Sequence, residues 1–135
     1  MEVIFQLSEE QVKQLHQLYQ TVWWAKGRSL EDTQKCVAGS QICIGLVDSN
    51  ENLIGFTRIL TDYIYKALLF DVIVCESHQG IGLGRKLVSL VKEHEQLQAV
   101  KHFELYCLAE LEGFYEGHGF TAAMGDLQLM RCVNA

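Results

Sequence analysis

Apolar and polar residues alternate with different spacings along the chain, and each spacing predicts one kind of element. Residues 3–7, VIFQL, indicate a short strand. Ser8 forms a capping-box pattern with Gln11, and the apolar residues behind it recur at helical spacing to about Trp24. A second, shorter helix is expected to end near Gly39.

The rest of the chain reads mainly as strands. Two apolar runs around the polar turn SNEN predict a hairpin, and the run ALLFDVIVC at 67–75 is apolar enough for a strand buried on both faces. A third helix is expected to run to about Gln96, followed by a strand at HFELYCLA, a short helix at LEGFYEGHGF and a closing strand at DLQLMRCV. The expected order is β–α–α–β–β–β–α–β–α–β, which describes an α/β protein with a mixed sheet flanked by helices.

The length and charge of the chain narrow its class. Its 135 residues indicate a single domain, 1–135, with enough apolar residues for a core. The net charge of −6 argues against duplex nucleic acid as a main partner, because binding phosphates requires a basic surface. No apolar run approaches the roughly 20 residues of a membrane helix, and the first residues lack the pattern of a signal peptide. Neither a nucleic-acid nor a membrane partner is therefore expected.

The five cysteines are odd in number and include no CxxC pair. Most of them lie within apolar, strand-like runs, where an unpaired cysteine behaves as a small apolar residue. We therefore expect neither a disulfide framework nor a zinc site, and no other metal site. Reduced cysteines indicate a cytoplasmic protein.

Residues 77–88, SHQGIGLGRKLV, place three glycines after the apolar strand and before a helix. The first N–H groups of a helix lack partners within it, so a glycine-rich turn at this point can bind an anion such as a phosphate. Two common phosphate-binding loops do not match: no GxxxxGK[ST] string is present, and Arg85 stands where GxGxxG requires its third glycine. A tight connection without a ligand is the alternative interpretation.

The string Q-x-x-G-x-G, carried by Gln79, Gly82 and Gly84, resembles the [QR]-x-x-G-x-[GA] signature of the GCN5-related N-acetyltransferases. The later segment GFYEGHGF resembles the FYexxGF segment of that family, and the expected order of elements is similar to its fold over nearly the whole chain. Two features depart from the family pattern. CLAELEG at 107–113 has no Asn, and VCESHQ lacks the proline that is common after the cofactor strand.

The resemblance implies acetyl-CoA as cosubstrate. In the family, the pyrophosphate binds the amides of the signature, and the pantetheine arm lies in a gap between two parallel strands, here 67–75 and 102–108. A backbone amide near Val74 is expected to polarise the thioester carbonyl. The implied cofactor-binding residues are Ile73, Val74, Gln79, Gly80, Ile81, Gly82, Leu83, Gly84, Arg85 and Phe114.

The resemblance also implies direct attack by the acceptor amine, with Tyr115 as the general acid for the leaving thiolate. The base stays open. Asp71 is the one charged residue within LLFDVIVC, and it is either that base or a hydrogen-bonded structural residue. Asp62 and a chain of water molecules are further candidates. The residues expected at the acceptor site are Trp24, Arg28, Arg58 and Asp62.

The function implied by the resemblance is acetyl transfer from acetyl-CoA to the primary amine of a small molecule. Two alternatives remain open: a non-catalytic acyl-CoA sensor, and an acetyltransferase of protein lysines or N-termini. The sequence does not choose the acceptor, because one fold accommodates many of them. The oligomeric state is also open, although a homodimer is common among such enzymes.

Overall fold

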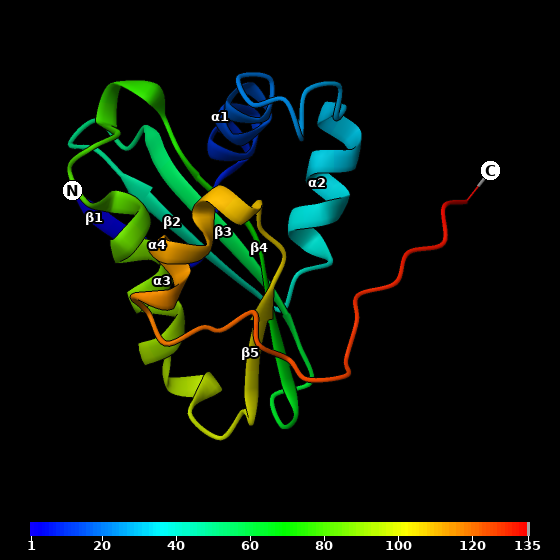
Figure 1. The fold of residues 1–135 in the computed structure, drawn as a ribbon. Coiled ribbons are helices and arrows are strands. Elements are labelled where there is room, and N and C mark those ends of the chain that lie inside the picture. Colours follow the sequence, from blue (N-terminus) through cyan, green and yellow to red (C-terminus); the bar gives the residue numbers. More distant parts are fainter. Residues whose placement is uncertain (135) are drawn as a thin grey trace.

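A five-stranded mixed sheet is the central layer of the computed structural model, which describes residues 1–134 (Figure 1). The strands stand in the order β1-β2-β3-β4-β5, and all neighbours are antiparallel except β4 and β5, which are parallel. Their bounds are β1 Glu2–Ile4, β2 Ile42–Val47, β3 Leu53–Thr61, β4 Lys66–Val74 and β5 His102–Leu105.

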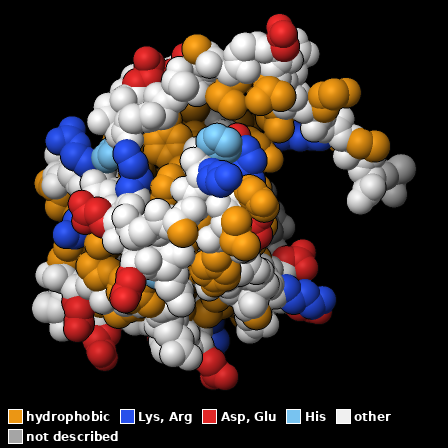
Figure 2. Space-filling view, turned by 90° about the horizontal axis from the view of Figure 1, so that it is seen from below, with side chains coloured by type: hydrophobic (Ala, Val, Ile, Leu, Met, Phe, Trp, Pro, Cys, Tyr) orange, Lys and Arg blue, Asp and Glu red, His pale blue; other side chains and the backbone are white. Residues whose placement is uncertain are grey.

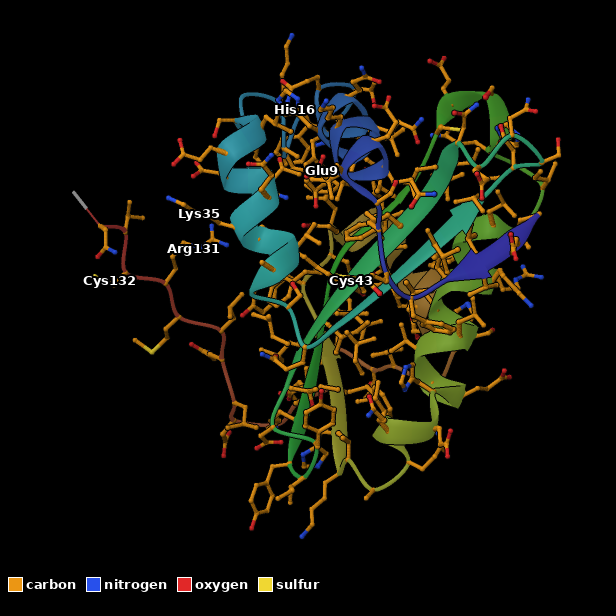
Figure 3. All side chains as sticks on the ribbon, turned by 180° about the vertical axis from the view of Figure 1, so that it is seen from behind. Glu9, His16, Lys35, Cys43, Arg131 and Cys132 are labelled. Carbon is orange, nitrogen blue, oxygen red and sulfur yellow. The ribbon has the colours of Figure 1, made fainter. Side chains whose placement is uncertain are left out.

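Helices cover both faces of this sheet. One face carries α1 (Glu9–Tyr19) and α2 (Leu30–Ala38), and the other carries α3 (Leu83–Glu93) and α4 (Glu112–Glu116) (Figures 1 and 3). The layers are therefore helix, sheet and helix, which matches the predicted α/β class. Short 3-10 turns lie in the connections at Glu76–His78, Glu95–Leu97 and Ala109–Leu111.

Two apolar cores hold the layers together. On the α1 side, Leu15 packs in a cluster with Phe56 of β3, and both are fully buried. On the α3 side, Leu87 belongs to a second cluster with side chains of β2, β3 and β4. Successive side chains of a strand point to opposite faces. In β2, Cys43 therefore joins the first core and Ile44 the second.

The predicted order of elements is confirmed as far as the fourth helix. The capping box is also present: the Ser8 hydroxyl oxygen accepts the Gln11 N–H at 3.2 Å, and the Gln11 side-chain oxygen accepts the Ser8 N–H at 2.9 Å. These bonds satisfy two N–H groups at the start of α1 that would otherwise lack partners.

The first helix ends at Tyr19 rather than near Trp24. Residues 20–28 fold back as a loop, which the side chain of Gln20 holds in place. Its amide nitrogen donates to the Arg28 carbonyl at 2.9 Å, and its oxygen accepts the Gly27 N–H at 3.2 Å. These contacts replace the helical bonds that periodicity alone predicted.

Three further elements are shorter than predicted. β1 takes up only the beginning of the strand expected at 3–7, and Phe5 lies outside it. The third helix ends at Glu93, because His94 has extended backbone. β5 ends at Leu105, well before the end of HFELYCLA.

The closing strand predicted for residues 126–133 is wrong for the single chain. Residues 128–134 make no backbone hydrogen bond within the described chain, and they run away from the body in extended form (Figures 1 and 3). A strand needs a neighbour for its N–H and C=O groups, which alternation of side chains does not supply. Residues 126–134 are called the C-terminal tail below.

The remaining global features concern membranes, thiols and metals. Among residues 1–134, no helix has the length and apolar character needed to cross a membrane. The cysteines are free thiols. In the same part of the chain, no group of three His, Cys, Asp or Glu side chains is arranged to hold a metal ion.

Candidate active site

β4 and β5 diverge about halfway along β4. Their last pair is Leu69 with Leu105, and β4 continues to Val74 without a strand on that side. A gap therefore opens in the sheet beside residues 70–74. The resemblance noted in the sequence implied a gap between these same two parallel strands.

A β-bulge lies where the gap begins. The register of β4 skips between Phe70 and Ile73, so Asp71 and Val72 stand opposite one residue of β3, Thr57. Asp71 has a φ of 58°, the left-handed conformation that aspartate adopts more readily than most residues. The buried Thr57 hydroxyl donates to the Phe70 carbonyl at 2.9 Å, which holds the bulge. A bulge bends and twists its strand, and here it turns the end of β4 away from β5.

The backbone of Val74 faces the gap. The Cys75 N–H donates to the Ile54 carbonyl of β3 at 2.9 Å, and neighbouring residues of a strand direct their polar groups to opposite edges. The Val74 groups therefore point away from β3, and its carbonyl accepts the Gln79 side chain at 3.1 Å. By the same alternation, the polar backbone groups of Ile73 point to β3, so Val74 and not Ile73 presents its N–H toward the gap, although the resemblance had implied both residues there.

The glycine-rich loop between β4 and α3 presents a row of N–H groups. Within the described chain, none of the backbone N–H groups of residues 80–85 donates a hydrogen bond. Gly80 has a φ of 81° and Gly82, the N-cap of α3, a φ of 89°, and both are surrounded by open space. This backbone conformation is costly for any residue with a Cβ. The loop and the positive end of the α3 dipole together form a cradle for an anion.

The fourth helix brings two aromatic residues close to this loop. The Phe114 ring lies 3.6 Å from the position that a Cβ on Gly84 would take, so α4 approaches the first turn of α3 at a glycine. Tyr115 is half-buried and its ring meets that of Phe120 edge-on. Burial raises the pKa of Tyr115, and the nearby thiol of Cys107 adds to this. The phenol is therefore neutral at physiological pH.

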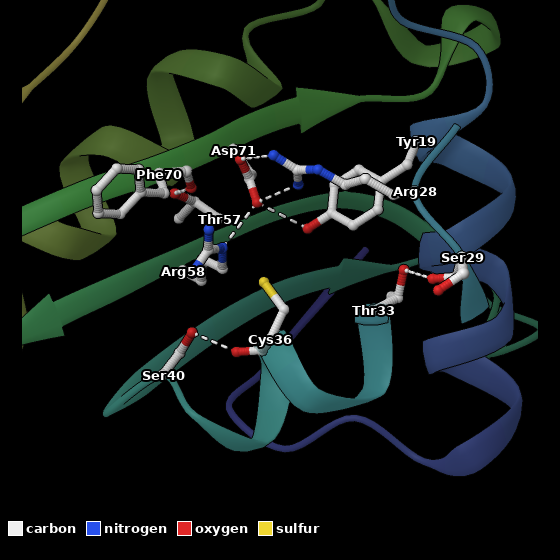
Figure 4. Close-up of polar contacts among 10 residues, drawn as sticks. All are labelled: Tyr19, Arg28, Ser29, Thr33, Cys36, Ser40, Thr57, Arg58, Phe70 and Asp71. Atoms are coloured by element: carbon white, nitrogen blue, oxygen red, sulfur yellow. Dashed lines mark hydrogen bonds and ion pairs between the residues drawn. The ribbon is translucent and has the colours of Figure 1, made fainter. Parts of the chain in front are cut away.

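On the α1 side of the sheet, Asp71 is the centre of an ion cluster (Figure 4). Its carboxylate accepts hydrogen bonds from Arg28 Nη1 at 2.8 Å, from Arg58 Nε at 2.7 Å and from the Tyr19 hydroxyl at 2.9 Å. The Asp71 side chain is 5% exposed, against 32% for Arg28 and 15% for Arg58. Burial by itself raises the pKa of Asp71, but the hydrogen bonds and charges of the two arginines outweigh it and lower the pKa.

Both guanidinium groups stack on aromatic rings. Arg28 lies 4.6 Å from the ring centre of Tyr19 and 5.5 Å from that of Trp24, and Arg58 lies 5.0 Å from that of Phe70. The Nη groups of Arg58 have no hydrogen-bond partner in the described chain. Every buried side-chain nitrogen in the described chain has a hydrogen-bond partner. The unpartnered Nη groups of Arg58 are therefore not buried, and they reach solvent. Two positive charges around one negative charge leave the cluster net positive.

The structure brings together three of the four residues expected at the acceptor site, since Trp24, Arg28 and Arg58 all lie around Asp71. Asp62 is not part of this cluster. It lies in the turn between β3 and β4, at the opposite end of β4 from the gap. There its carboxylate accepts hydrogen bonds from the backbone N–H groups of Ile64, Tyr65 and Lys66, as aspartates in turns commonly do.

Tyr19 is the member of the cluster that sequence reasoning missed. Helical spacing placed it on the apolar face of α1, and it is fully buried, but its hydroxyl donates to Asp71 from 52 positions away in the chain. The one signal was general: a buried tyrosine hydroxyl needs a partner. Burial and the Asp71 carboxylate both raise the pKa of Tyr19, so it donates as a neutral phenol.

A mixed sheet that opens between two parallel strands, beside a glycine-rich helix N-terminus, defines the acyl-CoA N-acyltransferase fold. The family model described as the acetyltransferase (GNAT) domain matches residues 38–122. The chain therefore belongs to the GCN5-related N-acetyltransferase family.

Relatives and solved structures agree with this membership. An uncharacterised N-acetyltransferase from Porphyra purpurea is 32% identical over 111 residues, which cover 79% of this chain and 63% of the relative. The chloroplastic serotonin N-acetyltransferase 2 of Oryza sativa is 28% identical over 113 residues, covering 84% of this chain and 48% of the relative. A solved GNAT-family structure from Xanthomonas campestris has a TM-score of 0.81 at 28% identity, covering 99% of this chain and 94% of that one.

The chain spans less than two thirds of the length of these curated relatives. The rice relative carries a chloroplast designation in its name, so the cytoplasmic location expected from the cysteines stays a prediction.

Proposed function

We propose that this protein transfers the acetyl group of acetyl-CoA to the primary amine of a small molecule. The observation that supports this most directly is the gap between β4 and β5 beside the unpartnered N–H groups of residues 80–85. Proteins of this family use acetyl-CoA, which supplies the thioester carbonyl that the amine attacks.

The residues around the gap fit this coenzyme. A diphosphate suits the N–H groups of residues 80–85 at the positive end of α3, and the exposed Arg85 adds a positive charge. The Val74 N–H is a donor for a carbonyl oxygen that becomes negative as a tetrahedral centre forms. Gln79 ties the loop to the end of β4 through the Val74 carbonyl, so it keeps the diphosphate cradle and this donor at a constant separation.

Tyr115 is the proposed general acid for the sulfur. Its raised pKa keeps the phenol protonated at neutral pH, so a proton is available when the C–S bond breaks. A thiol ionises near pH 8.5, well below this phenol. The phenol therefore stabilises the charge that develops on sulfur by donating a hydrogen bond. When its proton passes to the thiolate, the proton that the amine releases to water replaces it on the phenol.

The ion cluster around Asp71 gives the proposed acceptor site a net positive charge. Arg58 offers free Nη donors, and the partly exposed Arg28 binds the same carboxylate and lies over the ring of Trp24. A net positive surface repels polyamines and favours an amine that also carries a carboxylate or phosphate. We therefore propose an amine with an acidic group as the preferred acceptor.

We assign Asp71 a positioning role rather than that of general base. A base near neutral pH requires a raised pKa, and two arginines lower the pKa of Asp71. Its hydrogen bonds instead fix the direction of both guanidinium groups. The amine proton is then released to water, which was the other route left open by the sequence.

The names of relatives bear on the acceptor in both directions. Serotonin, in the name of the rice relative, is a small primary amine, which supports a small-molecule acceptor. A histone acetyltransferase of Glycine max is 28% identical over 75 residues, and its name supports the alternative of a protein acceptor. The experiment below therefore includes a lysine peptide.

A matched pair of acceptors tests the proposal. Purified protein is incubated with acetyl-CoA and phenylethylamine, phenylalanine, spermidine or a lysine peptide, and free thiol is followed. Phenylalanine differs from phenylethylamine by one carboxylate, so we expect kcat/KM about 10-fold higher or more for phenylalanine, as one charged hydrogen bond provides. Arg58→Lys should remove this preference while retaining turnover. Acetyl-CoA binding without turnover of any amine would favour the sensor, and turnover of the peptide alone would favour the protein acetyltransferase.

The acid role is tested by Tyr115→Phe. The variant should lose about 100-fold or more in kcat, while the Kd for acetyl-CoA measured by calorimetry changes less than about twofold. Tyr63→Phe, at the exposed tip of the β3–β4 hairpin, is the matched control and should leave both unchanged. Unaltered turnover in Tyr115→Phe would remove Tyr115 from this role.

A further inference from the structure

Arg28 is held at both ends by different parts of the chain. Its guanidinium binds the Asp71 carboxylate of β4 through two nitrogens, at 2.8 and 3.3 Å. At its other end, the backbone carbonyl accepts the side-chain amide of Gln20 at 2.9 Å and lies 3.0 Å from Nε2 of His16. A carbonyl oxygen only accepts, so this ring nitrogen donates, and the two donors use both lone pairs. The residue is therefore fixed from its backbone to its charge.

Gln20 directly follows α1 and ties the returning loop to that helix. Besides its bond to the Arg28 carbonyl, its amide nitrogen donates to the His16 carbonyl at 3.2 Å, and its oxygen accepts the Gly27 N–H at 3.2 Å. Gly27 has a φ of 103°, and glycine has many other conformations of similar energy. The backbone at this point therefore does not fix itself, and the side chain of Gln20 supplies the hold.

Loop 20–28 carries two of the residues at the proposed acceptor site. Ala25 is 2% exposed and anchors the middle of the loop in the α1-side core. The Trp24 ring meets that of Tyr19 edge-on at 6.3 Å, and its centre lies 5.5 Å from the Arg28 guanidinium. Figure 4 shows this guanidinium against the Tyr19 ring. The positions of Trp24 and Arg28 therefore depend on one loop.

The attraction of the acceptor site for an anion is local. The chain as a whole has a net charge of −6, and Figure 2 shows acidic and basic side chains interspersed on the face seen from below. Exposed charges more than about 10 Å apart are largely screened at physiological salt. Arg28 and Arg58 therefore attract an acidic group only when it reaches them, and the place where each is held decides the affinity.

We propose that Gln20 is a positioning residue for the acceptor, because it holds the backbone of Arg28 and so fixes the guanidinium beside which the acidic group of the amine binds. This inference rests on the acceptor proposed above. An arginine side chain that is free loses rotamer freedom when it binds a ligand, and one already fixed at both ends does not. The acidic group is remote from the reacting amine, so this preorganisation lowers KM and leaves kcat unchanged.

Steady-state kinetics with phenylalanine and phenylethylamine test this role. Gln20→Met keeps the length of the side chain and removes its donor and acceptor. In this variant KM for phenylalanine should rise about fivefold to tenfold, while kcat changes less than about twofold. KM for phenylethylamine, which has no carboxylate, should change less than about twofold. Gln17→Met, the same change at an exposed position of α1, is the control and should alter neither.

A second variant guards against a folding defect. Gln20→Ala removes the same hydrogen bonds without placing a larger apolar group at the end of α1, and it should give the same rise in KM with unchanged circular dichroism. An unchanged KM for phenylalanine in the folded variants, an equal rise for both amines, or a lower kcat at unchanged KM overturns the proposal.

Tryptophan fluorescence tests the hold on the loop without catalysis. Both tryptophans of the chain lie in loop 20–28, and the C-terminal tail contains none. With Trp23→Phe present in every protein, Trp24 is the single reporter. Gln20→Met should then raise acrylamide quenching about twofold, because Trp24 is only 38% exposed in the held loop.

The two measurements separate the failure of this inference from the failure of the proposed function. Unchanged quenching, in a protein whose wild type turns over both amines, refutes the role of Gln20 alone. A wild type that turns over neither amine refutes the proposed function, and the role of Gln20 toward the acceptor falls with it.

Discussion

The ion cluster around Asp71 gives the sharpest test of the structure. Asp71→Asn keeps the size of the side chain and removes its charge. The wild-type carboxylate accepts four hydrogen bonds, from Arg28 Nη1 and Nη2, Arg58 Nε and the Tyr19 hydroxyl. The amide nitrogen of asparagine cannot accept any of them, so at least one donor loses its partner and two positive charges lie together without compensation.

The cost follows from the exposure of each partner. Removing one member of a buried ion pair costs about 3–5 kcal/mol when the other member stays buried and uncompensated. Here Arg28 is 32% exposed and Arg58 15%, so water recovers part of the loss. We expect a loss of about 2–3 kcal/mol in the free energy of unfolding. For a chain of this length that is a fall in Tm of roughly 6–15 °C.

Urea unfolding followed by circular dichroism, with thermal melts alongside, measures this loss. Asp32→Asn is the matched control, because Asp32 is exposed and forms no ion pair in the described chain. It should change the unfolding free energy by less than about 0.5 kcal/mol. If Asp71→Asn unfolds within that same margin, the ion cluster does not stabilise the fold.

Three further outcomes follow from the same geometry. Because the folded pKa of Asp71 is lowered, its stabilisation is full above the unfolded value of about 4 and is lost as pH falls through the folded pKa; Asp71→Asn should flatten this acid limb of urea midpoint against pH, and an unchanged limb would contradict the assignment. Gly82→Asp should abolish calorimetric binding of acetyl-CoA, because its carboxylate repels the diphosphate, whereas Gly125→Asp, also at positive φ in open space, should bind normally; equal binding by both would mean that the phosphate cradle is misplaced. Thr57→Val leaves the Phe70 carbonyl without its donor and should cost about 1–2 kcal/mol in urea unfolding, and no measurable change would show that this bond does not hold the bulge.

Local patterns in the sequence predicted most of the elements, because hydrophobic period and caps act over a few residues. The Ser8 and Gln11 pair and the strand that contains Asp71 are read correctly within a window of about ten positions. The ends of elements were less predictable. α1 stops at Tyr19 because Gln20 bonds to a loop that follows it, and periodicity carries no information about such side-chain bonds.

The residues of the candidate site also differ in how far the sequence predicts them. The glycines of the loop are visible in the sequence, because positive φ and close backbone approach restrict which residue can stand there. The aspartate within an apolar strand also stands out, since burying a charge requires a partner. Its partners could not be named beforehand: Tyr19 and Arg28 come from the first helix and its loop, and only the packing of that helix on β4 brings them together.

By itself, the sequence determined the order of elements as far as the fourth helix, the glycine-rich turn before α3 and the family to which the chain belongs. The tertiary structure decided the gap, the net charge of the cluster around Asp71 and the absence of a closing strand in the described chain. The physical reason is that propensity and periodicity are properties of neighbours along the chain. A bulge, an ion cluster or an open strand edge exists only when distant segments meet or fail to meet.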